Sequence, residues 1–252
     1  MPKTLKIERL GATALLLLDR PEVRHAVNYE LIDEAEEALG MLNRDGDCRA
    51  VVLSGSGERA FCAGMDLNTV RRLDEDSSAD WMVRMKRLYE AVRGLDKPCV
   101  AAVNGVAAGA GYQLALLADL RVGHSGAKMG QTEINLGLAS LLGAHIMAPF
   151  LGHARTVELT LSGRLMGGDE CFRLGLFNYL VAAGDVRAKA LEVAEQLAQK
   201  PPTAMRLTKQ RFREDSQAGF NAVFEAATRL QGEAFASGEP GRVMAEFFAG
   251  KS

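Results

Sequence analysis

The sequence predicts an α/β protein with a largely parallel sheet in its core and a helical C-terminal part. Short apolar segments that end at or near glycine, residues 50–55 and 99–103, have the length and composition of buried strands. Helical patterns separate these segments, and a strand–helix–strand order implies crossover connections between parallel strands. From Ala154 onward almost all of the chain has a helical pattern. The expected architecture is therefore an α/β core followed by helices.

The N-terminal region is expected to hold two strands, a loop and a helix. Residues 5–10 and 12–18 are strand candidates around Gly11, residues 20–28 form a loop, and residues 29–43 form an amphipathic helix with an acidic outer face. The apolar run 12–18 follows three basic residues and so loosely imitates a secretory signal. Charged residues and Pro21 stand where a cleavage site would be, which favours a buried strand.

The remaining elements follow in the same alternation. Expected in order are a charged helical region at 71–93, the strand at 99–103, an apolar helix from about Gly109 to Leu117, and short strands at 120–122 and 127–129. Val181 is the last residue expected in a strand. Residues 185–252 are expected to form four helices, broken at 201–202, 217–219 and 238–240 by proline or glycine.

Composition excludes several classes of protein. The 252 residues are 48% hydrophobic and 25% charged with a formal net charge of −2, which is typical of a globular protein and gives no basic surface for nucleic acid. The four cysteines lack C-x-x-C spacing and are expected to be reduced thiols in a cytoplasmic protein. No stretch approaches the length of a membrane span, and the four histidines have no metal-ligand spacing, so neither a membrane nor a metal is expected.

Two glycine-containing turns remain as candidates for chemistry. The chain has no P-loop and no G-x-S-x-G, and Leu114 replaces the third glycine of a dinucleotide fingerprint. Residues 60–67 and 104–113 each follow a predicted strand, and the second turn also opens a helix. Free backbone N–H groups at such turns can bind an anion, and two that converge can form an oxyanion hole. Taken one at a time, each turn is better explained by close packing of a helix on a strand, because a lone glycine-rich turn is a weak motif.

Four segments together carry a resemblance to a known family. Phe61-Cys62-Ala63-Gly64-Met65-Asp66-Leu67, Lys97-Pro98 through Gly109-Ala110-Gly111, Gln131-Thr132-Glu133 through Gly137, and the loop Arg20 to Asn28 are similar, in order and spacing, to the crotonase (enoyl-CoA hydratase/isomerase) superfamily. The resemblance runs from residue 5 to about residue 209. It implies a crotonase-like ββα spiral core at residues 1–197 that binds acyl-CoA. It also implies a helical region at 198–252 that completes the CoA site and forms a homotrimer or a dimer of trimers. No separate cofactor is implied, because coenzyme A is part of the substrate.

The resemblance also assigns roles to four residues at the reacting end. Met65 and Ala110 match the two residues whose backbone N–H groups form the oxyanion hole, and Ala110 fits there if its φ is negative. Glu133 matches the main catalytic glutamate, and a buried cleft is expected to raise its pKa toward neutrality. Gln113 stands where hydratases of the family carry a second glutamate, and an amide can orient water but cannot exchange a proton with it.

The resemblance further implies a set of binding residues for the CoA thioester. Asp66 is expected to cap or order its loop, and Phe235 matches an aromatic side chain that reaches the CoA of a neighbouring subunit. Apolar tail residues such as Phe220 and Phe224 are expected to need cover from other subunits. The full set expected to contact the substrate comprises Val23, Arg24, Ala26, Val27, Ala63, Gly64, Met65, Asp66, Leu67, Gly109 and Phe235.

Three functions are compatible with these residues. An enoyl-CoA isomerase needs one acid/base, which Glu133 can be, and is favoured because Gln113 replaces the second acid. Dienoyl-CoA isomerases carry an aspartate where this chain has Leu141, so that subtype is disfavoured. An enoyl-CoA hydratase, in which Gln113 positions water, is the alternative. A non-catalytic or RNA-binding member is the most remote, because the helix at 29–43 is strongly acidic and would repel phosphate.

Overall fold

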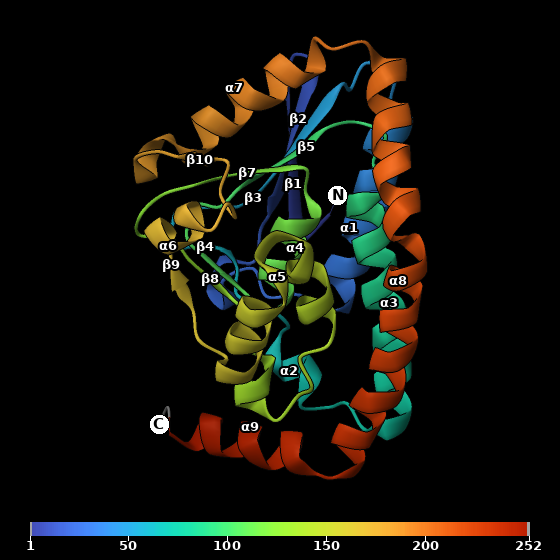
Figure 1. Cartoon of the computed structure of the whole chain (residues 1–252), viewed down its shortest axis with the longest axis vertical. Helices are drawn as coiled ribbons and strands as arrows, with labels where there is room; N and C mark the ends of the chain where they lie inside the picture. Colours follow the sequence, from blue (N-terminus) through green and yellow to red (C-terminus); the bar gives the residue numbers. More distant parts are fainter. Residues whose placement is uncertain (1, 251–252) are drawn as a thin grey trace.

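Two sheets and their covering helices form the protein, and the computed structural model describes residues 2–250 (Figure 1). The strands are β1 (Leu5–Leu10), β2 (Thr13–Leu18), β3 (Ala50–Gly55), β4 (Ala60–Cys62), β5 (Cys99–Ala102), β6 (Val106–Ala108), β7 (Leu120–Gly123), β8 (Lys128–Gly130), β9 (Met166–Gly167) and β10 (Tyr179–Leu180). The helices are α1 (Tyr29–Arg44), α2 (Leu67–Val70), α3 (Glu75–Arg93), α4 (Ala110–Leu117), α5 (Leu142–Ser162), α6 (Gly168–Arg173), α7 (Val186–Ala198), α8 (Pro202–Ala236) and α9 (Glu239–Ala249). Short 3₁₀ helices occur at η1 (Pro21–Val23), η2 (Glu133–Leu136) and η3 (Ala183–Asp185).

The chain alternates between the two sheets. The larger sheet has the order β1-β2-β3-β5-β7-β10 and the smaller one β4-β6-β8-β9. Consecutive strands β3 and β4, β5 and β6, and β7 and β8 therefore place one strand in each sheet, and helical segments follow each pair. Within each sheet these strands are parallel; the β1–β2 and β8–β9 pairs are antiparallel. This repeated ββα spiral confirms the predicted core.

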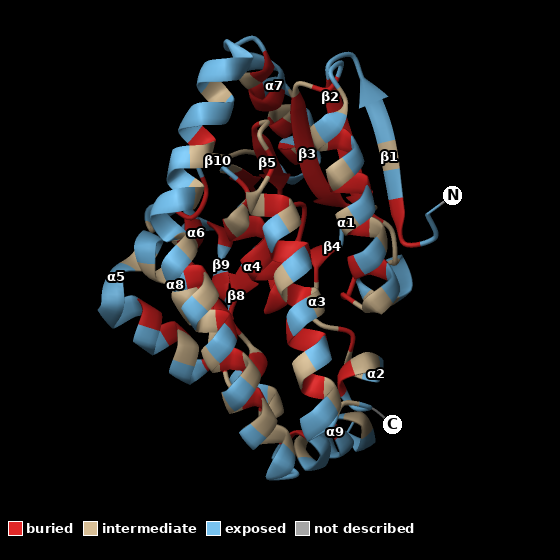
Figure 2. Cartoon of the chain, turned by 90° about the vertical axis from the view of Figure 1, so that its right-hand side faces the viewer, coloured by how far each residue is buried: buried red, intermediate tan, exposed pale blue. Residues whose placement is uncertain are grey.

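Both faces of the larger sheet are buried, which explains the uninterrupted apolar run of β2. Leu16 and Leu18 face the main core under α1, α3 and α4, whereas Leu15 and Leu17 pack with α7 on the other face. Figure 2 shows the buried strands between their covering helices. A strand covered on both faces reads as continuously apolar, so the run at 12–18 is the buried strand that the sequence analysis favoured over a signal peptide.

Residues 185–250, the described part of the C-terminal region, contain three helices, and the predicted break at 217–219 is wrong. The 35-residue helix α8 continues through this segment while it packs along α3 (Figure 1). Arg93 of α3 donates hydrogen bonds to Gln217 Oε1 at 2.8 Å and to Ser216 Oγ at 2.6 Å. A Cβ on Gly219 would lie 3.0 Å from His145 Cε1, so this glycine allows close packing and does not end the helix.

Other elements also differ from the sequence prediction. Strand β6 precedes α4, and β9 and β10 follow residue 154, where only helices and Val181 were expected. Phe220 and Phe224 are buried inside their own chain, where Phe224 lies 6.0 Å from the ring of Tyr89, so they need no cover from another subunit. The four cysteines are free and buried. In the described part of the chain, every helix is too short or too polar to cross a membrane.

Candidate active site

A cleft of about 600 Å³ lies between the 20–28 loop, the turn after β4, the start of α4, η2 and α9. Ten of the residues expected at the substrate line it: Val23, Arg24, Ala26, Ala63, Gly64, Met65, Asp66, Leu67, Gly109 and Glu133. A second, inner cavity of about 20 Å³ shares Met65 and Glu133 with the cleft and adds Ala110 and Gln113. The fold therefore brings together the segments that the sequence analysis singled out separately.

The first turn is held against the 20–28 loop by backbone hydrogen bonds. Val27 N–H donates to Gly64 O and Asp66 N–H donates to Val27 O, both at 2.8 Å. The two hydrogen bonds of this parallel bridge use Gly64 O and Asp66 N–H, and neither the N–H nor the C=O of Met65 takes part. The Met65 N–H therefore points away from Val27. The Met65 side chain is held from the other direction by Trp81, whose Nε1–H donates to Met65 Sδ at 3.3 Å. No acceptor within residues 2–250 takes the Met65 N–H.

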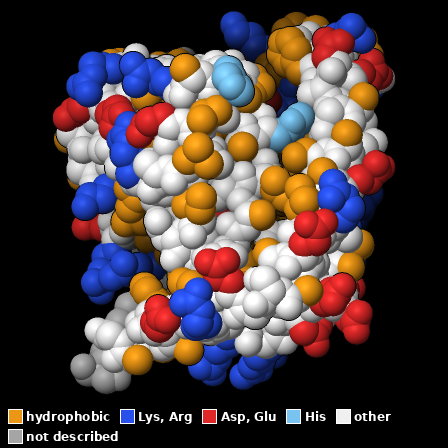
Figure 3. Space-filling model, turned by 60° about the horizontal axis from the view of Figure 1, so that its bottom comes forward, with side chains coloured by type: hydrophobic (Ala, Val, Ile, Leu, Met, Phe, Trp, Pro, Cys, Tyr) orange, Lys and Arg blue, Asp and Glu red, His pale blue; other side chains and the backbone are white. Residues whose placement is uncertain are grey.

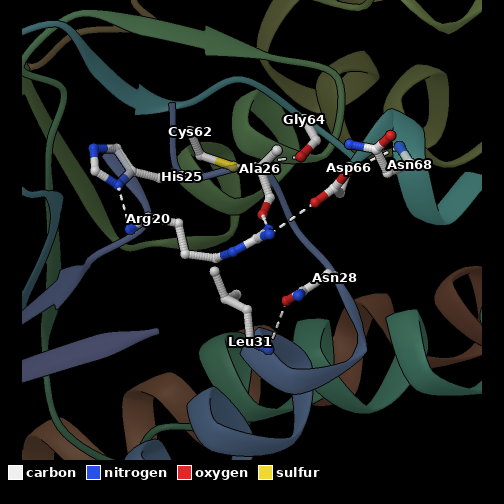
Figure 4. A network of polar contacts seen from close by, with 9 residues as sticks. All are labelled: Arg20, His25, Ala26, Asn28, Leu31, Cys62, Gly64, Asp66 and Asn68. Atoms are coloured by element: carbon white, nitrogen blue, oxygen red, sulfur yellow. Dashed lines mark hydrogen bonds and ion pairs between the residues drawn. The ribbon is translucent and has the colours of Figure 1, made fainter. Parts of the chain in front are cut away.

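Asp66 orders its loop in two ways, as predicted. Its side chain caps α2 by accepting from Asn68 N–H at 2.9 Å, and Oδ2 forms an ion pair with Arg20 at 2.8 Å. The Arg20 guanidinium also donates to Ala26 O (Figure 4). Both charged side chains are largely buried, with 15% of Arg20 and 7% of Asp66 exposed. The ion pair thus ties the loop at 20–28 to the turn that carries Met65, and the sequence analysis missed Arg20.

Asp66→Asn is expected to lower the free energy of unfolding by about 3 kcal/mol, because it leaves the Arg20 charge buried without a counter-ion. The amide can still cap α2. Asp74→Asn is the matched control: Asp74 caps α3, is exposed and has no arginine partner among residues 2–250, so its replacement should lower the free energy of unfolding much less. Urea unfolding of both variants measures the difference. If Asp66→Asn and Asp74→Asn lowered the free energy of unfolding equally, the ion pair between Arg20 and Asp66 would contribute nothing to stability.

The second turn places Ala110 at the first position of α4. Gly109 precedes it with φ of +51°, and the Ala110 N–H, like other N–H groups in a first helical turn, has no acceptor in the described chain. Ala110 is not among the described residues with positive φ, so alanine fits there. A Cβ built on Gly64 would lie 3.0 Å from Ala108 O and 3.8 Å from Ala110 N. The two turns are therefore in contact, and the N–H groups of Met65 and Ala110 belong to residues that line one inner cavity.

Glu133 is a buried carboxylate at the start of η2. Its Oε1 accepts a hydrogen bond from Gln113 Nε2 at 2.9 Å, whereas Oε2 has no partner among the described residues. A Cβ on Gly109 would come within 3.0 Å of Oε1, so the glycine makes room for the carboxylate. Burial raises the pKa of Glu133 to about 7, although hydrogen bonds from its own backbone and from Gln131 and Gln113 favour the charged form. The group can accept or donate a proton near neutral pH, as the sequence analysis expected.

Gln113 is fixed on both sides by buried partners. Its Nε2 donates to Gln131 Oε1 at 3.1 Å as well as to Glu133, and its Oε1 accepts from Tyr89 O–H at 2.5 Å. The two N–H groups of the Gln113 amide are both used, one on Gln131 and one on Glu133. They orient Glu133, and Gln113 has no free donor left for a water molecule. Gln131 was named in its segment without a role. Tyr89 was not identified from the sequence, because it looks like an ordinary core position of α3.

Two predicted residues line neither the cleft nor the inner cavity, and two aromatic side chains that were not predicted line the cleft. Val27 is fully buried and acts through its backbone. Phe235 packs in its own chain beside Leu67 and Leu136. The expected contact of Phe235 with the CoA of a neighbouring subunit stays a prediction. Phe247 and Phe248 of α9 line the cleft of their own chain, and Arg71 lies 5.5 Å from the centre of the Phe248 ring. The apolar face of α9 is the signal that could have indicated this position.

The raised pKa of Glu133 predicts a pH-dependent stability. Its ordinary value is 4.5 and its value in the folded protein is about 7, so the favourable contribution of the neutral form is complete below pH 4.5 and is lost as the pH rises to 7. The difference corresponds to about 3 kcal/mol. Glu133→Gln should therefore be more stable than the wild type at pH 8 by about that amount, with the gain vanishing near pH 4.5. Urea unfolding of both proteins at the two pH values measures this gain, and Glu58→Gln, at an exposed position, is the control. If the difference in free energy of unfolding between Glu133→Gln and the wild type did not depend on pH, the raised pKa of Glu133 would be contradicted.

The ββα spiral around a buried glutamate and two touching turns places the protein in the crotonase class, and comparison with known proteins agrees. The sequence pattern of the family "Enoyl-CoA hydratase/isomerase" matches residues 8–248. A short-chain-enoyl-CoA hydratase of Clostridium acetobutylicum is 27% identical over 96% of this chain and 93% of the relative. A crotonyl-CoA hydratase of Syntrophomonas wolfei is 28% identical over 91% and 87%, respectively. The crystal structure of an enoyl-CoA hydratase/isomerase from Pseudoalteromonas atlantica superposes with a TM-score of 0.88 at 26% identity, covering 98% of this chain and 97% of that one.

The chain belongs to the enoyl-CoA hydratase/isomerase family of the crotonase superfamily, and it is an enzyme of that family.

Proposed function

We propose that the protein moves the double bond of an enoyl-CoA, with Glu133 as its one acid/base. The observation that carries the proposal is the lining of the inner cavity, in which Glu133 is the one carboxylate among the described residues and Gln113 is held as an orienting amide. A single carboxylate is sufficient for isomerisation, because it can take a proton from one carbon and return it to another.

The proposed reaction starts when the thioester oxygen accepts hydrogen bonds from the N–H groups of Met65 and Ala110. Glu133 Oε2, which is unpartnered, removes a proton from Cα of a 3-enoyl group, and the negative charge moves onto the thioester oxygen as a dienolate. The two N–H groups stabilise this charge inside a site with little water. Glu133 then returns its proton to Cγ, which leaves a 2-enoyl-CoA. A pKa of about 7 suits both steps.

The cleft supports a CoA thioester as substrate. Its volume of about 600 Å³ is within the range of pockets that hold large ligands, and Arg24 at the 20–28 loop can meet a phosphate. The inner cavity of about 20 Å³ has room for about one water-sized group, which limits the acyl chain to a short one. Met82 and Met85 line this cavity, and their flexible side chains set its limit.

The proposal includes a homotrimer or a dimer of trimers in the cytoplasm. Exposed apolar side chains on α5 and α8 support such an assembly, namely Phe150, Val157, Leu161, Leu207 and Phe212. Figure 3 shows hydrophobic side chains spread over the face that these helices form, with many of the charged side chains nearer its edges.

Hydration of a 2-enoyl-CoA is the second candidate, and the printed names of the two relatives favour it. In that case Glu133 would perform all proton transfers. The amide donors of Gln113 are engaged by Glu133 and Gln131, so the version in which Gln113 alone positions water has less support than isomerisation.

Incubation with pent-3-enoyl-CoA and with pent-2-enoyl-CoA, followed by mass spectrometry, tests the two candidates. Isomerisation predicts interconversion of the two substrates without a change in mass. Hydration predicts a product heavier by one water from the 2-enoyl substrate. Rapid water addition with no interconversion would overturn the first candidate.

A further inference from the structure

Gln231 of α8 is a buried amide at the inner cavity with one unused polar atom. Its Nε2 donates to Ala139 O at 2.8 Å, and this contact fixes the orientation of the amide. Its Oε1 has no hydrogen-bond partner within the described chain, although 7% of the residue is exposed. Gln231 lines the same cavity as Glu133, whose Oε2 is also unpartnered. The described lining of this small cavity thus holds two unpartnered acceptors.

The rest of the lining makes this acceptor unusual. Met82, Met85, Leu141 and Leu142 are apolar, and a purely hydrocarbon acyl chain packed among them would leave Gln231 Oε1 without a donor. A buried acceptor without a donor costs free energy, whereas a hydroxyl group at the same place would satisfy it. The cavity volume of about 20 Å³ admits one group the size of a water molecule.

We propose that the inner cavity binds a hydroxyl group, which donates its hydrogen bond to Gln231 Oε1, and that Gln231 thereby determines which acyl group the enzyme prefers. The hydroxyl is the one at the far end of a short hydroxylated acyl chain. The inference rests on the proposed function only in placing the acyl end of a CoA thioester in this cavity. Saturated ligands therefore test it without any turnover.

The experiment compares Gln231→Met with the wild type. Methionine keeps the length and helix propensity of the side chain and removes the acceptor. Gln210→Met is the matched control, because it makes the same change on α8 about 30 Å along the helix. Dissociation constants are measured by calorimetry for butanoyl-CoA and 4-hydroxybutanoyl-CoA, and for pentanoyl-CoA and 5-hydroxypentanoyl-CoA. The result for each protein is the ratio of its two dissociation constants within a pair. A general loss of stability affects both constants equally and therefore cancels from the ratio.

The wild type and Gln210→Met should bind at least one hydroxylated ligand about tenfold tighter than its unsubstituted partner, and Gln231→Met should lose that preference. Ratios near one in the wild type, or a preference that Gln231→Met keeps, would overturn the proposal. Isomerisation of pent-3-enoyl-CoA, assayed separately, shows whether the proposed function has failed instead.

Discussion

Glu133→Gln is expected to lower kcat by a factor of about 10²–10⁴ while the Kd for a saturated acyl-CoA changes little. Glutamine has the size of glutamate and can still accept the hydrogen bond from Gln113 Nε2, so the cavity keeps its shape. What is lost is the one group in the inner cavity that can carry a proton near neutral pH. Turnover of pent-3-enoyl-CoA and calorimetric binding of butanoyl-CoA give the two quantities.

Glu22→Gln is the matched control for this variant. Glu22 lines the outer cleft but not the inner cavity, so its replacement should leave kcat nearly unchanged. For the wild type, kcat/KM should rise with pH and level off above an apparent pKa near 7, because the reaction starts with the charged form of Glu133. Turnover within tenfold of the wild type in Glu133→Gln would remove Glu133 from the mechanism.

The parts of the site that are local in sequence were predictable. The turns at 60–67 and 104–113 and the segment that starts at Gln131 each carry their own signal. The fold adds that the two turns meet so closely that a Cβ on Gly64 would lie only 3.0 Å from Ala108 O. Asp66 was expected to cap or order its loop once the family resemblance was recognised, and its side chain does both.

The parts that depend on packing between distant segments were not predictable in the same way. Tyr89 reaches Gln113 because α3 packs on α4, and Gln231 reaches the inner cavity because α8 runs along α3. Neither side chain has a local pattern that distinguishes it from its neighbours on a helix. Strands β4, β6 and β9 have two or three residues each, which is too short for periodicity to be seen. Their positions follow from pairing between strands of successive ββα turns.

Gly64→Ala is expected to lower kcat/KM by a factor of about 10²–10³. The φ of Gly64 is +106°, which L-residues rarely adopt, and the added Cβ would lie 3.0 Å from Ala108 O. Relief of this contact requires rotation of the backbone around residue 64. That rotation moves the Met65 N–H and weakens the hydrogen bond from Val27 N–H to Gly64 O. The loss in rate is about that of one oxyanion donor, in addition to a loss of about 1–3 kcal/mol of stability.

Gly11→Ala separates these two effects. Gly11 also has positive φ, at +62°, but a Cβ there meets nothing within 4 Å, and the residue lies in the β1–β2 turn away from the cleft. Its replacement should cost about 1–2 kcal/mol of stability and leave kcat/KM unchanged. Steady-state kinetics and urea unfolding of both variants give the comparison. If Gly64→Ala retains kcat/KM within twofold of the wild type at a stability loss like that of Gly11→Ala, the Met65 N–H is not a donor to the reacting oxygen. A large loss of kcat/KM confined to Gly64→Ala would instead mean that the position of this one peptide group controls the rate.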